Sequence, residues 1–480
     1  MNNTLKRTIK IFYIVVFFLL CILPFVGMFF KSEDTSNTEN RTLSSPPQLI
    51  VDGGINDSFG SDAETYVSEH FGFRNTLISL NSAIYYDVFK QSNQQDVIVG
   101  TNGWLYYTPT LNDYLNRDAL SDNEISCIVR TLELQQEYVL SYGGNYVFTV
   151  VPNKNTLYPQ GMPSRYIKSN EQNTLTKLTN ALSSTDIHYC NLKDVLSAQD
   201  SILYHKDDTH WNNHGALVGY NAILDYANVP HNDYSTVSFN SVKSWSGDLA
   251  TMLSPNSTRL DYQIEYDIDY NYQYTSRLRT DNLDDITITT ANSSAEGSLL
   301  MFRDSFGRAI LPFMAENFNS AEFSRAMPYN LSTTDADLVV QEIVERNIVN
   351  LTKSAPIMLA PKRLNVTIPE QVISNDSNLL QCNISQGLEA VKLYGKISCN
   401  LQDYSNIHIY VVVDGANTYE AFPIFEQELL SDYTLNNDEV GYSLLVPQEV
   451  AKEGSTVEVL LYSNDSAVST TGILGTITNS

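Results

Sequence analysis

Residues 298–307 read SLLMFRDSFG, and this stretch decides the fold. An apolar run of the kind found in buried strands ends at Phe302, and Ser305 follows just before the helical pattern of RAILPFMAENF. In sheets covered by helices, active sites gather at the carboxyl ends of the strands. Ser305 therefore lies where a nucleophile would be exposed, near the backbone N–H groups of a helix start. Pro312 is expected to kink or end this helix after its first turn.

The region around this stretch alternates short apolar runs with helical patterns. A helix is expected over residues 75–89, and another from Ser121, where Glu124 completes a capping box. Four apolar runs are expected to form strands: 96–99, 146–151, 187–191 and 298–302. Continuous apolar runs of this length between helices predict an α/β fold with a parallel sheet covered on both faces.

A second motif, DDTHWN, covers residues 207–212 and precedes an amphipathic helix that Asn212 or Asn213 can cap. Asp208 and His210 are two residues apart, so in an extended loop their side chains can point to the same side. A carboxylate beside a histidine holds one imidazole tautomer and stabilises the imidazolium. Together with Ser305, the pair supplies the groups that nucleophilic acyl transfer requires.

Each motif alone has a simpler explanation. An Asp-Ser pair is commonly a helix cap, and an Asp-x-His pair is commonly a satisfied polar contact. A metal site has to be weighed as well, because five potential ligands are close together in the chain: His205, Asp207, Asp208, His210 and His214. Their spacing matches none of the usual zinc patterns. We therefore expect neither a metal nor another cofactor.

The N-terminus carries a membrane signal. Residues 11–30 contain no charge and are long enough to span a bilayer, and Lys6, Arg7 and Lys10 precede them. The positive-inside rule then places residues 31–480 outside the cytoplasm. An uncleaved, single-pass signal anchor is the expected form, with a cleaved signal peptide as the alternative. Residues 1–30 would form the cytoplasmic tip and anchor, and the polar residues 31–60 a stalk.

The remaining chain is expected to form two domains, a catalytic α/β domain over residues 61–370 and a β-sandwich over 371–480. The second region consists of strand-like runs separated by Gly, Asn, Asp and Ser, a pattern typical of an antiparallel sandwich. Carbohydrate binding is a candidate role for it. Cys382 and Cys399 lie in neighbouring runs and could bridge a hairpin, or remain unpaired in the core.

The composition excludes some partners. The chain has 480 residues, 29 Lys and Arg against 55 Asp and Glu, and a net charge of −26, which argues against binding nucleic acid. A hydrophobic content of 42% excludes general disorder, whereas only 18% of residues are charged. Such an uncharged polar surface fits a neutral or amino-sugar glycan. An anionic glycan would need a local cationic site, for which Arg303 and Lys154 are candidates.

The motifs resemble those of a known family. Asp208-Thr209-His210-Trp211 resembles the DxHW block of the alginate O-acetyltransferase-like proteins, also called DHHW proteins, and residues 303–306 are similar to their serine block. Two departures occur, Arg303 in place of a glycine and Thr209 in place of the first histidine. The resemblance extends over about residues 38–350. Softer similarities are at 39–41 (ENR), 70–74 (HFGFR), 97–100 (VIVG), 103–107 (GWLYY), 151–154 (VPNK) and 246–249 (SGDL).

The resemblance implies an SGNH-hydrolase-like enzyme with Ser305 as nucleophile, His210 as base and Asp208 as the residue that orients the base. It implies O-acetylation of an extracytoplasmic polysaccharide, with a membrane-bound O-acyltransferase supplying the acetyl group. Two alternatives remain. A carbohydrate esterase would use the same three residues with water as the acceptor, and a non-catalytic cell-surface protein would bind glycan or act as a scaffold.

Four further residues are candidates for the substrate site. Arg303 could bind an acidic sugar or pair with a carboxylate, and Lys154 could contact substrate, although a surface position is the commoner one for lysine. Trp211 could stack on a sugar ring or pack the loop. Groups near Asn153 or Gly247, together with the backbone N–H of Ser305, are candidate donors to an oxyanion.

Overall fold

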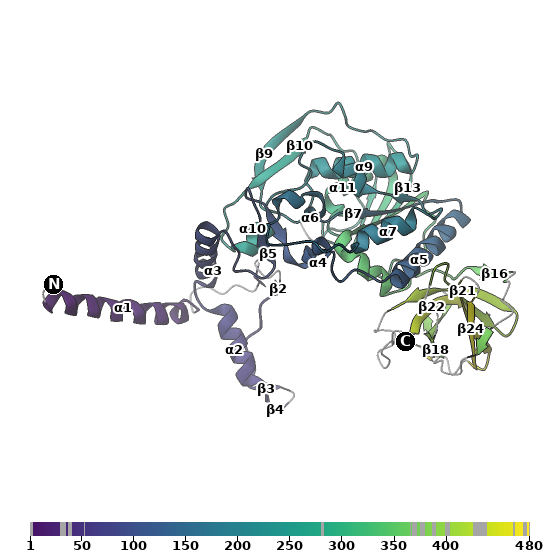
Figure 1. Ribbon diagram of the computed structural model, residues 1–480, viewed down its shortest axis with the longest axis horizontal. Coiled ribbons are helices and arrows are strands. Elements are labelled where there is room, and N and C mark those ends of the chain that lie inside the picture. Colours follow the sequence, from purple (N-terminus) through teal and green to yellow (C-terminus); the bar gives the residue numbers. More distant parts are fainter. Residues whose placement is uncertain are drawn as a thin grey trace.

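The computed structural model shows a separate N-terminal helix, an α/β body and a C-terminal β unit (Figure 1). It describes residues 3–28, 35–36, 41–51, 53–279, 283–364, 366, 372–374, 380–385, 390–398, 404–425, 439–463, 466–473 and 478–479. Helix α1 (Asn3–Gly27) extends away from the body, and its segment Arg7–Gly27 is long and apolar enough to cross a membrane. Such a helix near the N-terminus is either an anchor or a signal sequence.

The body is built on a seven-stranded mixed sheet, which confirms the expected α/β fold. The strand order is β11-β12-β14-β13-β15-β7-β8. The five strands from β14 to β8 are parallel to one another. At one edge, β12 pairs antiparallel with β14, and β11 pairs antiparallel with β12. The bounds are β7 Asn145–Val151, β8 Tyr189–Cys190, β11 Gln273–Tyr274, β12 Thr287–Ala291, β13 Glu296–Phe302, β14 Phe318–Ser324 and β15 Leu338–Val344.

Helices cover both faces of this sheet, because its central strands are apolar on both sides. In β7, Val147 and Val151 belong to the core under α9 (Asn213–Tyr226) and α11 (Gly307–Asn317). The alternate residues Tyr146 and Phe148 belong to the core under α5 (Asp122–Ser141) and α7 (Thr174–Leu182). This two-residue alternation is the normal side-chain period of a strand.

Several helix predictions can be compared with the structure. Helix α5 begins with the predicted capping box, and the helix predicted at 75–89 is present as α3 (Arg74–Ile84) followed by a π-turn at Tyr85–Phe89. Pro312 does not end the helix, because α11 continues to Asn317 with Pro312 inside it, so of the two expected effects the ending was wrong and the kink stays a prediction. Its apolar residues pack against α9 and the sheet, and this burial outweighs the single hydrogen bond that a proline removes.

One strand prediction was wrong in its placement. Residues 96–99 contain β5 (Val97–Val99), but within the described part of the chain β5 pairs with β6 (Leu105–Tyr107) alone and forms a hairpin outside the main sheet. A second hairpin joins β9 (Phe239–Trp245) to β10 (Asp261–Tyr266). The smaller elements are β1 Thr35–Ser36, β2 Arg41–Thr42, β3 Ile50–Val51, β4 Gly54–Ile55, α2 Phe59–His70, α4 Leu111–Leu115, α6 Lys154–Leu157, α8 Leu192–Ser197 and α10 Asp248–Leu253.

The C-terminal unit is a mainly antiparallel sheet, as expected. Strand β21 pairs with β20 through its first half and with β22 through its second half, so the sheet folds over a shared apolar core. Cys399 lies outside the described residues, and so does the choice between a bridge to Cys382 and two unpaired cysteines. The strands are β16 Lys362–Arg363, β17 Val372–Ser374, β18 Leu380–Ser385, β19 Ala390–Ser398, β20 His408–Val413, β21 Asn417–Ile424, β22 Glu439–Pro447, β23 Thr456–Ser463, β24 Ser466–Ile473 and β25 Thr478–Asn479.

The C-terminal unit packs against the body through α5. Glu420 of β21 is almost fully buried and pairs with Arg130 of α5 at 2.7 Å and with Arg363 at 2.7 Å. Phe422 of the same strand lies in the apolar core under α5. The junction therefore combines a buried ion-pair network with apolar packing.

Candidate active site

Ser305, His210 and Asp208 form a continuous chain of hydrogen bonds. His210 Nε2 lies 2.8 Å from Ser305 Oγ, and His210 Nδ1 lies 2.7 Å from Asp208 Oδ1. Ser305 follows the carboxyl end of β13 and precedes α11, while the other two residues lie on the loop that enters α9. A neutral His210 with its proton on Nδ1 donates to Asp208 and can accept the Ser305 proton, which is the arrangement of an activated serine.

Asp208 is held by four hydrogen bonds and is shielded from solvent. Its Oδ1 also accepts from the backbone N–H of His210 at 2.9 Å, and its Oδ2 accepts from Trp245 Nε1 at 2.9 Å and from Asp248 N at 3.1 Å. Burial would raise the pKa of Asp208, but the charge of His210 and its hydrogen bonds outweigh burial and hold that pKa well below its usual range. The carboxylate is therefore ionised and fixed in orientation.

The loop from Leu203 to Asn212 takes its shape from local backbone contacts. Asn212 N donates to Leu203 O at 2.8 Å, and the Asn212 side chain accepts from Gly215 N at 2.9 Å, which caps α9. A side chain at position 215 would not fit, because a Cβ there would lie 2.4 Å from Leu203 O. The predicted cap thus fixes the short turn that places His210 opposite Ser305.

Lys154 lies inside the protein and stabilises the loop from Leu203 to Asn212 through hydrogen bonds to its backbone. Only 5% of its surface is exposed, and its Nζ donates to the carbonyls of His205 at 3.1 Å, Lys206 at 3.0 Å and Asp208 at 2.5 Å. The expectation of a surface lysine was wrong, because these three oxygens compensate the ammonium for its lost water. Burial lowers the pKa of Lys154 to about 8, an effect that the charges of Asp248 and Asp208 partly offset.

Arg303 is also buried, with 3% exposure, and does not face a substrate. Its guanidinium donates to the carbonyls of Leu283 at 2.6 Å, Asp304 at 3.3 Å and Asp285 at 3.5 Å. The guanidinium therefore binds backbone carbonyls, and neither of the two expected roles, binding an acidic sugar or pairing with a carboxylate, is seen. Gly307 packs on the aliphatic part of the Arg303 side chain. A Cβ at position 307 would lie 2.6 Å from Arg303 Cβ, so the buried arginine requires a glycine at this position.

Trp211 and Asn153 are buried as well. Trp211 is 2% exposed, donates from Nε1 to the Phe306 carbonyl at 2.9 Å and packs its ring on Phe306, so it fixes the loop and does not stack on a sugar. Asn153 is fully buried, and its Nδ2 donates to Asp113 at 2.9 Å. An amide nitrogen carries two hydrogens, so this bond engages only one of them and the role of Asn153 as an oxyanion donor stays a prediction.

The backbone N–H of Ser305 is free to serve as an oxyanion donor. Among the residues that the structure describes, this N–H has no hydrogen-bond partner, whereas the next one, Phe306 N, donates to Asp304 Oδ1 at 2.9 Å. Asp304 is anchored in turn, since its Oδ2 accepts from Val344 N at 2.8 Å. The serine turn is therefore fixed around one available donor, as an oxyanion hole requires.

Sequence reasoning missed three residues at the site. Trp245 donates to Asp208, and Asp248 Oδ2 accepts from the Thr209 hydroxyl at 2.5 Å, 3.6 Å from His210 Nδ1. Asp248 lies in the SGDL block of residues 246–249, whose spacing alone assigns it no role. Arg346 lies 5.4 Å from the Phe306 ring centroid and 5.8 Å from that of Tyr107. Its position just after the carboxyl end of β15 was the available signal.

The residues weighed as metal ligands separate into different contacts. Asp207 pairs with Arg259 at 2.6 Å, His214 Nδ1 lies 2.7 Å from the Tyr266 hydroxyl, and the buried His205 ring stacks on Trp245. Asp208 and His210 do lie with Asp248 close enough to share a cation. However, the facing atoms of all three already hydrogen bond within the protein, which fits a proton relay better than a metal centre.

Comparisons with known proteins support the fold and the class. Residues 97–296 match the model of the SGNH hydrolase-like domain of the acetyltransferase AlgX, which confirms the resemblance stated above. The matched residues include Asp208 and His210 and end before Ser305. No curated protein matches the chain.

The matches to solved structures each cover 52% of this chain. They include a DHHW family protein from Eubacterium siraeum at 17% identity, with 94% of that chain covered and a TM-score of 0.38. Bacillus cereus PatB1 with a sulfonyl adduct matches at 15% identity, with 96% covered and a TM-score of 0.41. The O-acetyltransferase domain of Pseudomonas putida AlgJ matches at 14%, with 91% covered and a TM-score of 0.34. At these values no residue role is transferred.

Proposed function

We propose that the protein is an O-acetyltransferase that modifies an extracytoplasmic polysaccharide through an acetyl-Ser305 intermediate. The observation that supports this proposal is the hydrogen-bonded chain from Asp208 through His210 to Ser305, with distances of 2.7 and 2.8 Å. The match to the AlgX acetyltransferase domain supports the same reaction class. Helix α1 would anchor the protein, and a membrane-bound O-acyltransferase would supply the acetyl group.

The reaction has two halves. In the first, His210 Nε2 takes the Ser305 proton while Oγ bonds to the acetyl carbon; the donor's leaving group then departs with that proton. In the second, a sugar hydroxyl gives its proton to His210 and attacks the acetyl carbon, and Ser305 leaves with the proton returned. The Ser305 backbone N–H would stabilise the oxyanion in both halves, and Asp208 the imidazolium.

The first test traps the intermediate. An activated acetyl ester should label Ser305, and mass spectrometry of the digested protein should locate the added acetyl group on that residue alone. Ser305→Ala should remove the label and the transfer activity while the melting temperature stays close to that of the wild type. An acetyl group found on any other residue would overturn the assignment.

The acceptor is tested separately. Donor and oligosaccharide are incubated with the enzyme, and the products are weighed. Acetylated oligosaccharide is expected for the transferase. Free acetate alone, released at the same rate with and without oligosaccharide, would instead assign the same residues to a carbohydrate esterase.

A further inference from the structure

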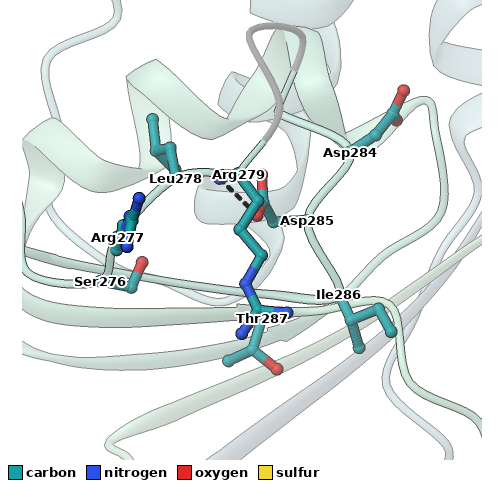
Figure 2. Close-up of a pocket in the computed structure, with 8 residues that line it drawn as sticks. All are labelled: Ser276, Arg277, Leu278, Arg279, Asp284, Asp285, Ile286 and Thr287. Atoms are coloured by element: carbon teal, nitrogen blue, oxygen red, sulfur yellow. Dashed lines mark hydrogen bonds between the residues drawn. The ribbon is translucent and has the colours of Figure 1, made fainter.

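A cavity of 1020 Å³ is lined by residues 276–279 and 284–287, which Figure 2 shows. Arg303, two residues before Ser305, donates to the carbonyl of Asp285 in the cavity wall at 3.5 Å and to the carbonyl of Leu283, next to that wall in the chain, at 2.6 Å. On the other side, Arg308 approaches Asp284 at 3.6 Å and donates to the Ser305 carbonyl at 3.2 Å. The cavity is thus connected to the nucleophile's turn from both sides. Its lining is Ser276, Arg277, Leu278, Arg279, Asp284, Asp285, Ile286 and Thr287.

Two exposed arginines of this cavity, Arg277 and Arg279, form no ion pair with any carboxylate that the structure describes. Among the described residues, neither Arg277 nor Arg279 has an ion-pair or hydrogen-bond partner for its guanidinium. The two lining carboxylates are already engaged, Asp284 with Arg325 at 2.6 Å and Asp285 with the backbone N–H of Arg279 at 2.8 Å. In a chain with 55 acidic residues, two free arginines in one cavity indicate a site for an external anion.

The local charge is positive although the chain as a whole is strongly negative. Besides the two free arginines, Arg303, Arg308 and Arg325 surround the cavity wall. Burial, together with the charge of Arg325, lowers the pKa of Arg303 to about 10. An anion that enters here gains from several cations at once, and with little competition from the protein's own carboxylates.

A second cavity, of 400 Å³, adjoins the first along the antiparallel edge of the sheet. Thr287 lines the first cavity, and its register partner Ser324 lines the second. Two carboxylates, Glu322 and Asp335, line the second cavity, but most of its polar side chains are hydroxyls, which include Thr275, Thr289, Ser298, Ser320, Ser324 and Thr333. Hydroxyls both donate and accept hydrogen bonds, so this trough suits a polyhydroxylated chain.

We propose that Arg277 and Arg279 bind an anionic group, a carboxylate or a phosphate, on the acceptor polysaccharide, with neighbouring sugars in the hydroxyl trough. The proposal rests on the proposed function and specifies its substrate class. A guanidinium presents a planar pair of donors that matches both anions. These two residues supply the local cationic site that an anionic glycan requires, in place of the buried Arg303 and Lys154.

The test measures binding of the full-length Ser305→Ala protein in detergent by calorimetry. The probes are a uronic acid oligosaccharide, the same oligosaccharide with its carboxyl groups reduced to alcohols, and a glycerol phosphate oligomer. At a net charge of −26, a protein lacking this site would favour the neutral probe. We expect one of the anionic probes to bind roughly tenfold more tightly than the neutral one, and the favoured probe to identify the anion.

The arginines are tested on the same background. R277Q/R279Q should remove the roughly tenfold preference, and R277K/R279K should retain part of it. The matched control K353Q/K452Q replaces two exposed lysines outside both cavities and makes the same change in net charge, so the preference should persist. A neutral probe that binds as tightly as both anionic ones, or a preference unchanged in R277Q/R279Q, would overturn the proposal. Acetylation of Ser305 is measured independently and does not depend on this outcome.

Discussion

Lys154 gives the loop of Asp208 and His210 its support. The three carbonyls that surround its ammonium come from residues more than 50 positions later, so no local pattern announces them. For the same reason the sequence could not predict that Arg303 would be buried. Short-range spacing did bring Asp208 next to His210, because that contact depends on two neighbouring residues alone. The positions of Lys154 and Arg303 depend on carbonyls that are distant in the sequence, so they can be recognised only in the folded structure.

The lowered pKa of Lys154 predicts that enzymatic activity falls at alkaline pH. Its pKa is lowered to about 8, chiefly by burial, and above this pH the neutral amine has only two hydrogens for three carbonyls. We expect kcat/KM to fall as pH rises through about 8. A lysine whose pKa is lower in the folded state binds fewer protons there than when unfolded. Its contribution to the free energy of unfolding should therefore increase between pH 8 and roughly 10.4.

Activity and the Lys154 contribution to stability should thus change in opposite directions. The measurement is a pH profile of kcat/KM alongside melting temperatures. Lys154→Arg remains charged throughout this range and should lose the limit near pH 8. If its profile keeps that limit, the limit belongs to another group.

At the scale of elements, the start of α9 fixes the geometry of the site. The alternation of apolar runs and helical patterns was sufficient to predict β7, β13, α5 and α9, because burial on both faces leaves a continuous apolar signature. The same signature misplaced β5, since a buried hairpin strand is as apolar as a strand of the main sheet. Pairing partners are set by long-range packing and are not encoded in a single run.

Asn212→Ala tests the link between the helix cap and catalysis. Loss of an asparagine cap should lower the free energy of unfolding by about 1 kcal/mol. Because Asn212 also shapes the turn after His210, kcat should fall severalfold as well. Ser121→Ala removes the capping box of α5 and is the matched control, with a similar loss of stability and unchanged kcat. Equal kcat in the two variants would contradict the link.

At the scale of the whole molecule, Glu420 connects the C-terminal unit to the body. Burial would raise its pKa, but the hydrogen bond with His408 and the charges of Arg130 and Arg363 outweigh burial and lower the pKa to about 2. A lowered carboxyl pKa contributes stability that is complete above the unfolded value near 4.3 and is lost as pH falls towards 2. Deleting residues 371–480 would also uncover the apolar face of α5, so the role of this unit is better tested by substitution.

Glu420→Gln should weaken the junction strongly. Removing one partner of a buried ion pair leaves the remaining charges uncompensated, at a cost of roughly 3–5 kcal/mol. Glu133→Gln is the matched control, because Glu133 pairs with the same Arg130 at 2.6 Å but is 35% exposed, and its loss should cost less than about 1 kcal/mol. Thermal melts of both variants from pH 3 to 8 provide the comparison. If Glu420→Gln lowered the free energy of unfolding less than Glu133→Gln, Glu420 would not stabilise the junction as expected.

The hydrogen bond from Trp211 to the Phe306 carbonyl joins two segments 95 residues apart in the chain. It connects the residue after His210 to the residue after Ser305, so it holds the two turns together. For protein engineering, the two turns form one transplantable unit. A chimaera that exchanges the serine turn with that of a relative should keep its activity only when residues 203–212 are exchanged with it.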